Sequence, residues 1–376
     1  MKFQVGLNKI LHAIRWRYYR YLKPKLGFLF KLLSVISSYF EVHPVKVIEN
    51  KVSKNPVEHL VSNFSNDQEI VNDFALIRII GNDLYPRHKL GQTRENLDFI
   101  LKNEGVLDRA HKVWVVNRIF SPEERAKIID LLEFYAQEYI EIPFLDHEYK
   151  RVKLVYDKLS TDNYLLSDDF ASLDEIKKAR ILNYVYKDKN KYVMNNNGAR
   201  NLALTIGKRK ARWVLPFDGN CFFTADAWSK LVAVVDKEPW RKHFVVPMAR
   251  MLSNELLLKD DRNIPEALEE PQIMFRADTH TEFNPEFYYG RRPKVELFWV
   301  LGIPGKWDKW TDDEFDEQRR SLSSEANSFG VAGWVARLFS GMPHLEKTQN
   351  EASRSRYVVR QTAILETLKY LDSTIK

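Results

Sequence analysis

The stretch Phe74-Ala-Leu-Ile-Arg-Ile-Ile80 decides the fold class, because it is a short apolar run that ends at Gly81-Asn82-Asp83. Such a run followed by turn residues predicts a buried β-strand. Lys112-Val-Trp-Val-Val116 and Tyr139-Ile-Glu-Ile142 repeat the pattern further along the chain. A helical pattern separates each pair of these strands. This alternation predicts an α/β fold with a mostly parallel, Rossmann-type sheet flanked by helices.

The two intervening helices are expected at about 93–101 and from Ser121 onwards. The second has the clearest start signal in the chain. Ser121 suits the N-cap, Pro122 suits the first helical position, and Glu124 follows Ser121 at the spacing of a capping box. Both helices are long enough to cross over between parallel strands.

Polar side chains follow the three strands. Parallel sheets bind ligands beyond the carboxyl ends of their strands, so the loops after Gly81, Asn117 and Pro143 are expected to open on one edge. Their residues would suit a base, a ribose and phosphates: Asn82, Asp83, Arg87, His88, Asn117, Arg118, Asp146 and His147. The alternative is that they are ordinary polar loop residues.

Residues 195–207 read as a loop rich in Asn and Gly, a short helix and a glycine stop. Free N–H groups and a partial positive charge at such a helix start favour phosphate. Arg200 lies in the first turn, where the helix dipole alone disfavours a cation. A nearby bound anion would explain it, and so would an ion pair with a surface carboxylate.

A further buried strand, Arg212-Trp-Val-Leu-Pro-Phe217, ends in Asp218-Gly219-Asn220. Two oxygen-bearing side chains at positions i and i+2 of a strand end are able to point to one side. Oxygen ligands suit Mg²⁺ or Mn²⁺, which typically bridge to substrate phosphates. An Asp-Gly-Asn triplet is also an ordinary turn.

The stretch from Gly198 to Asn220 resembles the donor-binding core of GT-A-fold glycosyltransferases, those of family 2 in particular. In that family a helix with an Arg-Asn pair precedes a strand ending in an Asp-x-Asp motif. The likeness covers roughly residues 74–305. It implies a GT-A-like fold and a nucleotide-sugar donor bound by these residues: Arg78, Asn82, Asp83, Arg87, Asn117, Arg200, Asn201 and Asp218.

The resemblance also implies a divalent metal, Mg²⁺ or Mn²⁺, at Asp218 and Asn220, with His280 as a third ligand. Asn220 departs from the family pattern, because an Asn stands where the second acid is usual. Its carbonyl oxygen still ligates a metal, but one negative charge is lost. For His280 the alternative is an ordinary surface or hydrogen-bonded histidine.

The acceptor is expected to bind near 277–292, which gathers acids, aromatics and arginines. Inverting transferases need a carboxylate to deprotonate the acceptor hydroxyl, and Asp278 is the expected catalytic base. Three other carboxylates compete with it: Glu282, Glu286 and Glu296. From about Asp312 onwards the sequence reads as helical, which predicts a C-terminal helical cap.

The net charge of +7 is unevenly distributed. Residues 1–40 contain eight lysines and arginines and no acid, and the remaining chain has 50 basic against 51 acidic residues. The folded part therefore lacks the basic surface of a nucleic-acid-binding protein. The single cysteine, Cys221, excludes an intramolecular disulfide and is expected to be a buried structural thiol.

The basic stretch precedes an apolar run at 26–40 that is too short for an ordinary membrane span. It suits attachment to an anionic membrane surface; a helix packed on the protein itself and a true anchor are the alternatives. We therefore expect a cytoplasmic protein, peripheral on the inner face of the membrane. The expected division is an extension at 1–72, a catalytic domain at 73–310 and a helical region at 311–376.

The sequence thus predicts a glycosyltransferase that moves a sugar from a nucleotide-sugar donor to a glycan or lipid-linked acceptor, in surface polysaccharide synthesis. Two alternatives remain open. One is a nucleotidyl- or sugar-phosphate transferase on a similar sheet. The other is a non-catalytic scaffold at the membrane that keeps the fold.

Overall fold

The computed structural model describes residues 72–161, 163–259, 265–305, 308, 313–342 and 351–375. All of them belong to the unit Ile70–Lys376. The basic N-terminal stretch, its apolar run and the linker fall within residues 1–71, outside the described residues. Within the described part, no helix is long and apolar enough to cross a membrane.

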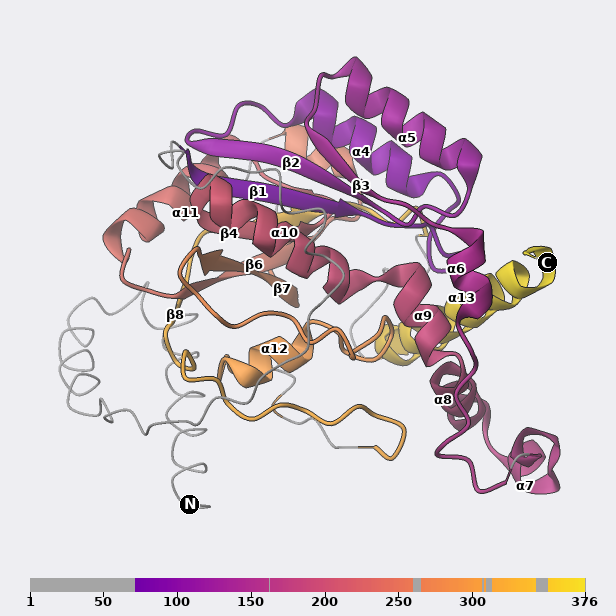
Figure 1. The fold of residues 1–376 in the computed structure, drawn as a ribbon. Helices are drawn as coiled ribbons and strands as arrows, with labels where there is room; N and C mark the ends of the chain where they lie inside the picture. Colours follow the sequence, from indigo (N-terminus) through magenta and orange to yellow (C-terminus); the bar gives the residue numbers. More distant parts are fainter. Residues whose placement is uncertain are drawn as a thin grey trace. The chain divides into compact units, whose positions relative to one another are not determined.

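The first half of the sheet is parallel, as the sequence predicts. Its strands are β1 (Asn72–Ile80), β2 (Ala110–Asn117), β3 (Tyr139–Ile142) and β4 (Ala211–Asp218). They lie in the order β3-β2-β1-β4 (Figure 1). β4 pairs with β1 in spite of the long segment between them. The expected α/β fold is confirmed.

The second half of the sheet runs in mixed directions. β7 (Glu269–Arg276) is antiparallel to both β4 and β6 (His243–Arg250). β8 (Phe329–Val331) and β9 (Val335–Arg337) are parallel to β6, and β9 also pairs with β5 (Cys221–Phe222). In the described residues, nine strands therefore form one mixed, mostly parallel, curled sheet.

Helices cover both faces of this sheet. α4 (Gln92–Asn103), α5 (Pro122–Phe134) and α11 (Ala225–Lys237) pack on one face, where their apolar side chains join two large buried clusters. α10 (Asn196–Lys210) packs on β1 and β4 from the other face (Figure 1). The Ser121 side chain caps α5 by accepting a hydrogen bond from the Glu124 N–H at 3.3 Å, as expected.

Shorter helices follow β3 and lead into α10. They are α6 (Asp146–Arg151), α7 (Asp168–Ser172), α8 (Glu175–Val185) and α9 (Lys187–Met194). Short 3₁₀ turns lie at Tyr164–Leu166 and Asn254–Leu258, and α12 (Val295–Val300) follows the loop after β7. Figure 1 shows α13 (Glu351–Thr374) beside α8 and α9, which it contacts.

The C-terminal region differs from the expected helical cap. Its described residues 313–342 contain no helix and supply β8 and β9 to the sheet. Only α13 is helical, and its apolar face, with Ile364, Leu368 and Leu371, is buried as the sequence pattern predicts. The strands are only three residues long, and such short runs carry too little periodicity to be recognised.

Cys221 is free and fully buried in β5, as expected. Burial raises the pKa of its thiol to about 12, so the thiol is protonated at neutral pH.

Candidate functional site

A cavity of about 820 Å³ lies at the carboxyl ends of β1 and β4. The strand order reverses here, because the chain proceeds from β1 outward to β2 while β4 lies on the other side of β1. Loops that diverge at such a point leave a crevice. Its walls include Gly81–Asp83, Asn117 and Asp218–Asn220. Since ligand pockets commonly measure about 300–1,000 Å³, a nucleotide-sized molecule fits.

Asp218, the last residue of β4, is the central carboxylate of the cavity. Its Oδ1 accepts a hydrogen bond from Arg200 Nη2 at 2.8 Å, and its Oδ2 accepts one from Gln272 Nε2 at 2.9 Å. Lys294 Nζ lies 3.6 Å from Oδ2. Burial alone would raise the pKa of Asp218, but Lys294, Arg200 and the Gln272 hydrogen bond hold it far below its usual range. Asp218 is therefore ionised and already surrounded by donors.

Arg200 is the fifth residue of α10, in its second turn rather than the expected first, and reaches Asp218 from there. Asn197 Oδ1 accepts a hydrogen bond from Arg200 Nη1 at 2.9 Å, and the guanidinium stacks on the Phe283 ring, 5.4 Å from its centroid. Arg200 does pair with a carboxylate, but not with one on the surface. Its partner is the carboxylate of the cavity, so the pair forms part of the cavity wall.

The loops from β1 and β2 are held in place by their own polar residues. Asn82 donates to the Arg118 carbonyl oxygen at 2.7 Å and accepts from the Phe120 N–H at 3.0 Å. Asp83 accepts from the Thr93 N–H and hydroxyl at the start of α4, although burial raises its pKa. Asn117 donates to the Met194 carbonyl oxygen at 2.8 Å. All three line the cavity, but these contacts give them a positioning role first.

Three expected donor-binding residues do not line the cavity: Arg87, which is fully buried, Arg78 and Asn201. Arg78 lies on the α4 face of β1, where it forms a buried ion pair with Glu104. Asn201 bridges the backbone of Phe283, donating to its carbonyl oxygen at 2.8 Å and accepting from its N–H at 3.0 Å. Arg78 and Asn201 hold the fold, because neighbouring residues in a strand or helix point to different sides.

Asp278 and His280 lie at the amino ends of the parallel strands, opposite to the cavity. β7 is antiparallel to β4, and Arg276 pairs with Trp213 near the start of β4. Asp218 lies five residues further along β4, roughly 16 Å away at 3.3 Å per residue. The chain after β7 therefore emerges at the amino ends of the parallel strands, away from the cavity.

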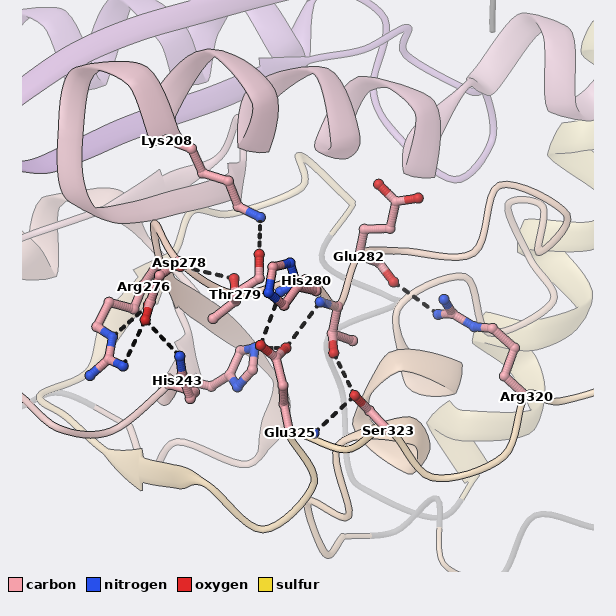
Figure 2. A network of polar contacts seen from close by, with 12 residues as sticks. Lys208, His243, Arg276, Asp278, Thr279, His280, Glu282, Arg320, Ser323 and Glu325 are labelled. Atoms are coloured by element: carbon pink, nitrogen blue, oxygen red, sulfur yellow. Dashed lines mark hydrogen bonds and ion pairs between the residues drawn. The ribbon is translucent and has the colours of Figure 1, made fainter. Parts of the chain in front are cut away.

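Figure 2 shows the polar network that Asp278 and His280 join instead. Asp278 is exposed and accepts hydrogen bonds from Arg276 and Lys242. The His280 N–H donates to Glu325 Oε1 at 3.0 Å, and its side chain is exposed. Asp278 is distant from the cavity, so it is not a suitable candidate for the catalytic base.

The competing carboxylates of this region also lie outside the cavity. Glu296 is fully buried against Arg320, Glu286 pairs with Lys191 at 2.8 Å, and Glu282 is exposed. Two other carboxylates, Glu269 and Glu270 at the start of β7, do line it. The direction of β7 explains why Glu269 and Glu270 line the cavity and the carboxylates after β7 do not. The first residues of β7 lie beside Asp218, and its last residues lie at the other end of β4.

The predicted metal set does not fit a shared ion. Asp218 and Asn220 line the cavity, but His280 does not. Both oxygens of Asp218 face cationic or amide donors, which would have to move for a cation to bind. Among the described residues, no group of three His, Cys, Asp or Glu side chains is arranged to hold a metal.

The cavity lining is rich in positive charge. Among the described residues, seven arginines and lysines face four carboxylates. Part of this charge comes from Arg291, Arg292 and Lys294, in a loop whose basic run is visible in the sequence. No local sequence pattern predicts that Arg337 on β9 and Arg360 on α13 line the cavity, because both are distant in sequence from the other lining residues. The lining favours an anionic ligand.

No model of a known protein family matches this chain, and a comparison with curated proteins finds no significant match.

Proposed function

We propose that this protein is a nucleotide-sugar-dependent glycosyltransferase with a GT-A-like fold. One observation carries the proposal: a cavity of nucleotide size lies at the carboxyl ends of β1 and β4 and has an excess of positive charge. This is where sheets of this kind bind nucleotides. The diphosphate of a nucleotide-sugar is the anion that such a lining would attract.

Lys294 and Arg200 are the proposed contacts of the donor diphosphate. Lys294 is almost fully buried, and its ammonium lies 3.6 Å from Asp218 and 3.4 Å from Glu270. Asp218 holds both cations in position from the end of β4. Charge-assisted hydrogen bonds from these groups would stabilise the negative charge that develops on the leaving nucleoside diphosphate.

Glu270 is the proposed catalytic base in place of Asp278. Its carboxylate lines the cavity, remains 42% exposed, and lies 3.4 Å from Lys294. In a direct displacement, the acceptor hydroxyl gives its proton to Glu270 while its oxygen bonds to the anomeric carbon. The bond from that carbon to the diphosphate breaks, and the nucleoside diphosphate leaves with the electron pair.

The acceptor is proposed to be a glycan or a lipid-linked glycan of a surface polysaccharide. The basic residues 1–40 support this choice, because they would bring the enzyme to an anionic membrane surface on the cytoplasmic side. Their structure lies outside the described residues.

The test is incubation of the purified chain with UDP-, GDP- and CMP-sugars in Mg²⁺, Mn²⁺ or EDTA, followed by product analysis. Release of the nucleoside phosphate part with sugar transfer or hydrolysis is expected. Glu270→Gln is expected to lower turnover about 100-fold or more. Lys294→Met is expected to weaken donor binding about 10–100-fold, the effect of losing one charged hydrogen bond.

Asp278→Asn is the matched control, since it alters a carboxylate of the same segment at the far edge of the sheet. It is expected to leave turnover unchanged. Loss of activity in this control, with none in Glu270→Gln, would contradict the proposed site. Pyrophosphate as product would favour nucleotidyl transfer, and tight donor binding without turnover would favour a non-catalytic scaffold.

A further inference from the structure

Arg87 is a fully buried arginine with no partner among the described residues. It lies in the loop after β1 and is 0% exposed. Within that part of the chain, no group accepts a hydrogen bond from its Nε, Nη1 or Nη2 atoms. Burial lowers its pKa to about 10, so the guanidinium remains charged at neutral pH.

The charges around Arg87 are mostly positive. Arg250, Arg337 and Arg360 all lie close enough to lower its pKa further, and Tyr289 is the neighbour that raises it. Glu269 is the carboxylate of this group, but Arg250 binds it at 2.7 Å and Arg337 at 3.3 Å. The cluster of Arg87, Arg250, Arg337 and Arg360 is thus underbalanced in negative charge within the described part of the chain.

This arginine cluster adjoins the cavity. Arg87 itself lies behind the lining, and its neighbours His88, Tyr289, Arg337 and Arg360 form the wall. The Nδ1 atom of His88 accepts a hydrogen bond from the Leu84 N–H at 3.3 Å. Burial and the nearby arginines lower the pKa of His88, so its ring is neutral and carries its proton on Nε2 as a further donor.

Arg78, nine positions earlier, shows what a structural arginine looks like in this fold. It is equally buried, at 1% exposure, but it is paired with Glu104 and lies over the Trp114 ring. Burying a charge without a partner costs several kcal/mol, so an unpaired buried cation usually has a ligand that balances it. Arg87 has no such partner among the described residues, which is the condition of a cation that binds an anionic ligand.

We propose that Arg87, Arg337 and Arg360 form a phosphate subsite of the cavity. Arg337 and Arg360 line the cavity and Arg87 lies close behind them, and several neighbouring guanidinium groups suit a phosphate, which accepts multiple charge-assisted hydrogen bonds. The cations would neutralise the phosphate directly, so binding needs no divalent metal. The subsite deepens the proposed function and rests on it only for which substrate carries the phosphate, the nucleotide donor or a phosphate-bearing acceptor.

The test measures binding of inorganic pyrophosphate to the full chain in EDTA at fixed ionic strength, by calorimetry and by the shift in Tm. The wild type is expected to bind and to gain thermal stability. Arg87→Met and Arg360→Met are each expected to weaken binding about 10–100-fold. Arg125→Met, on the surface of α5, is the matched control and should bind like the wild type.

Stability separates a ligand-binding arginine from a structural one. Without ligand, Arg87→Met should melt at the same temperature as the wild type or higher, because it removes an unbalanced charge. Arg78→Met should melt lower. Absence of pyrophosphate binding in EDTA, equal binding by Arg87→Met, or a loss of Tm in Arg87→Met matching that of Arg78→Met would overturn the proposal.

Competition identifies the source of the phosphate. If saturating UDP or GDP prevents pyrophosphate binding, the subsite holds the donor diphosphate; if both bind together, it holds a phosphate of the acceptor. The two proposals fail separately. Turnover of a donor by a chain whose pyrophosphate binding is insensitive to Arg87→Met and Arg360→Met would overturn only the subsite. Metal-free pyrophosphate binding without turnover of any donor would overturn only the transferase.

Discussion

Glu104, which caps the C-terminus of α4, is a residue on which several buried polar contacts converge. Its side chain is fully buried, pairs with Arg78, lies 3.2 Å from Lys112 Nζ, and accepts a hydrogen bond from the Phe223 N–H at 2.9 Å. Glu104→Ala is expected to lower the free energy of unfolding by about 3–5 kcal/mol, because it leaves the Arg78 charge buried and uncompensated. Denaturant unfolding monitored by circular dichroism measures this difference.

An exposed pair provides the comparison. Glu141 binds Arg125 at the surface, so Glu141→Ala should cost less than about 1 kcal/mol. Equal effects of the Glu104 and Glu141 substitutions would show that burial does not decide the strength of these ion pairs.

At the residue scale, the sequence predicts which side chains lie at the cavity better than it predicts whether they bind a ligand or hold the fold. Asp218, Arg200, Asn82 and Asp83 were predicted at the site and do line the cavity. Arg78 is expected to bind the donor, but its side chain points to the face of β1 that α4 covers, where it pairs with Glu104. Whether a charged residue is paired depends on partners that are distant in sequence, and no local pattern carries that information.

Gly219 allows the ends of β1 and β4 to approach each other. A Cβ atom at this position would lie 2.5 Å from the Ile79 carbonyl oxygen and 3.3 Å from Ile80 Cα. Both are backbone atoms and cannot rotate away. Gly219→Ala is therefore expected to destabilise the fold by about 1–3 kcal/mol, the usual cost of overpacking, and to distort the cavity floor. Thermal or chemical unfolding measures the loss.

Gly81 is the matched control at the end of the adjacent strand. Apart from its two chain neighbours, no heavy atom of the described residues lies within 4 Å of a Cβ placed there. Gly81→Ala should change the free energy of unfolding by less than about 0.5 kcal/mol. A larger loss in Gly81→Ala than in Gly219→Ala would show that the close approach is misplaced.

At the element scale, the parallel strands were predictable and the antiparallel one was not. β1, β2 and β3 each follow the apolar run and turn that the sequence shows. β7 has a similar composition, but its direction follows from its pairing with β4, which is a long-range contact. Because β7 is antiparallel to β4, Asp278 and His280 lie at the amino ends of the parallel strands. Glu269 and Glu270, at the start of β7, lie at the cavity.

The stability of the whole molecule should depend on pH through buried histidines. His243 is fully buried, and burial lowers its pKa below the usual 6.5, against the opposing effect of Glu325. Below pH 6.5 the unfolded chain therefore binds more protons than the folded chain. Stability must fall as pH decreases, and His88 adds an effect of the same sign.

Between pH 6.5 and 5, His243 alone should account for a loss of about 1–2 kcal/mol in unfolding free energy. His243→Phe keeps a ring against Phe275 and removes the titrating group, so its loss over this range should be smaller than that of the wild type. Identical slopes for the two proteins, measured by denaturant unfolding at each pH, would rule out this contribution.

Hydrogen exchange tests directly whether the donor binds at the carboxyl ends of β1 and β4, as we propose. Amide exchange is measured with and without saturating UDP or GDP, whichever binds. Protection is expected in the segments 81–84, 218–220 and 290–294, while 278–282 at the opposite edge should exchange at an unchanged rate. Protection confined to 278–282, or no protection at 81–84 and 218–220 under saturating nucleotide, would contradict this placement of the donor.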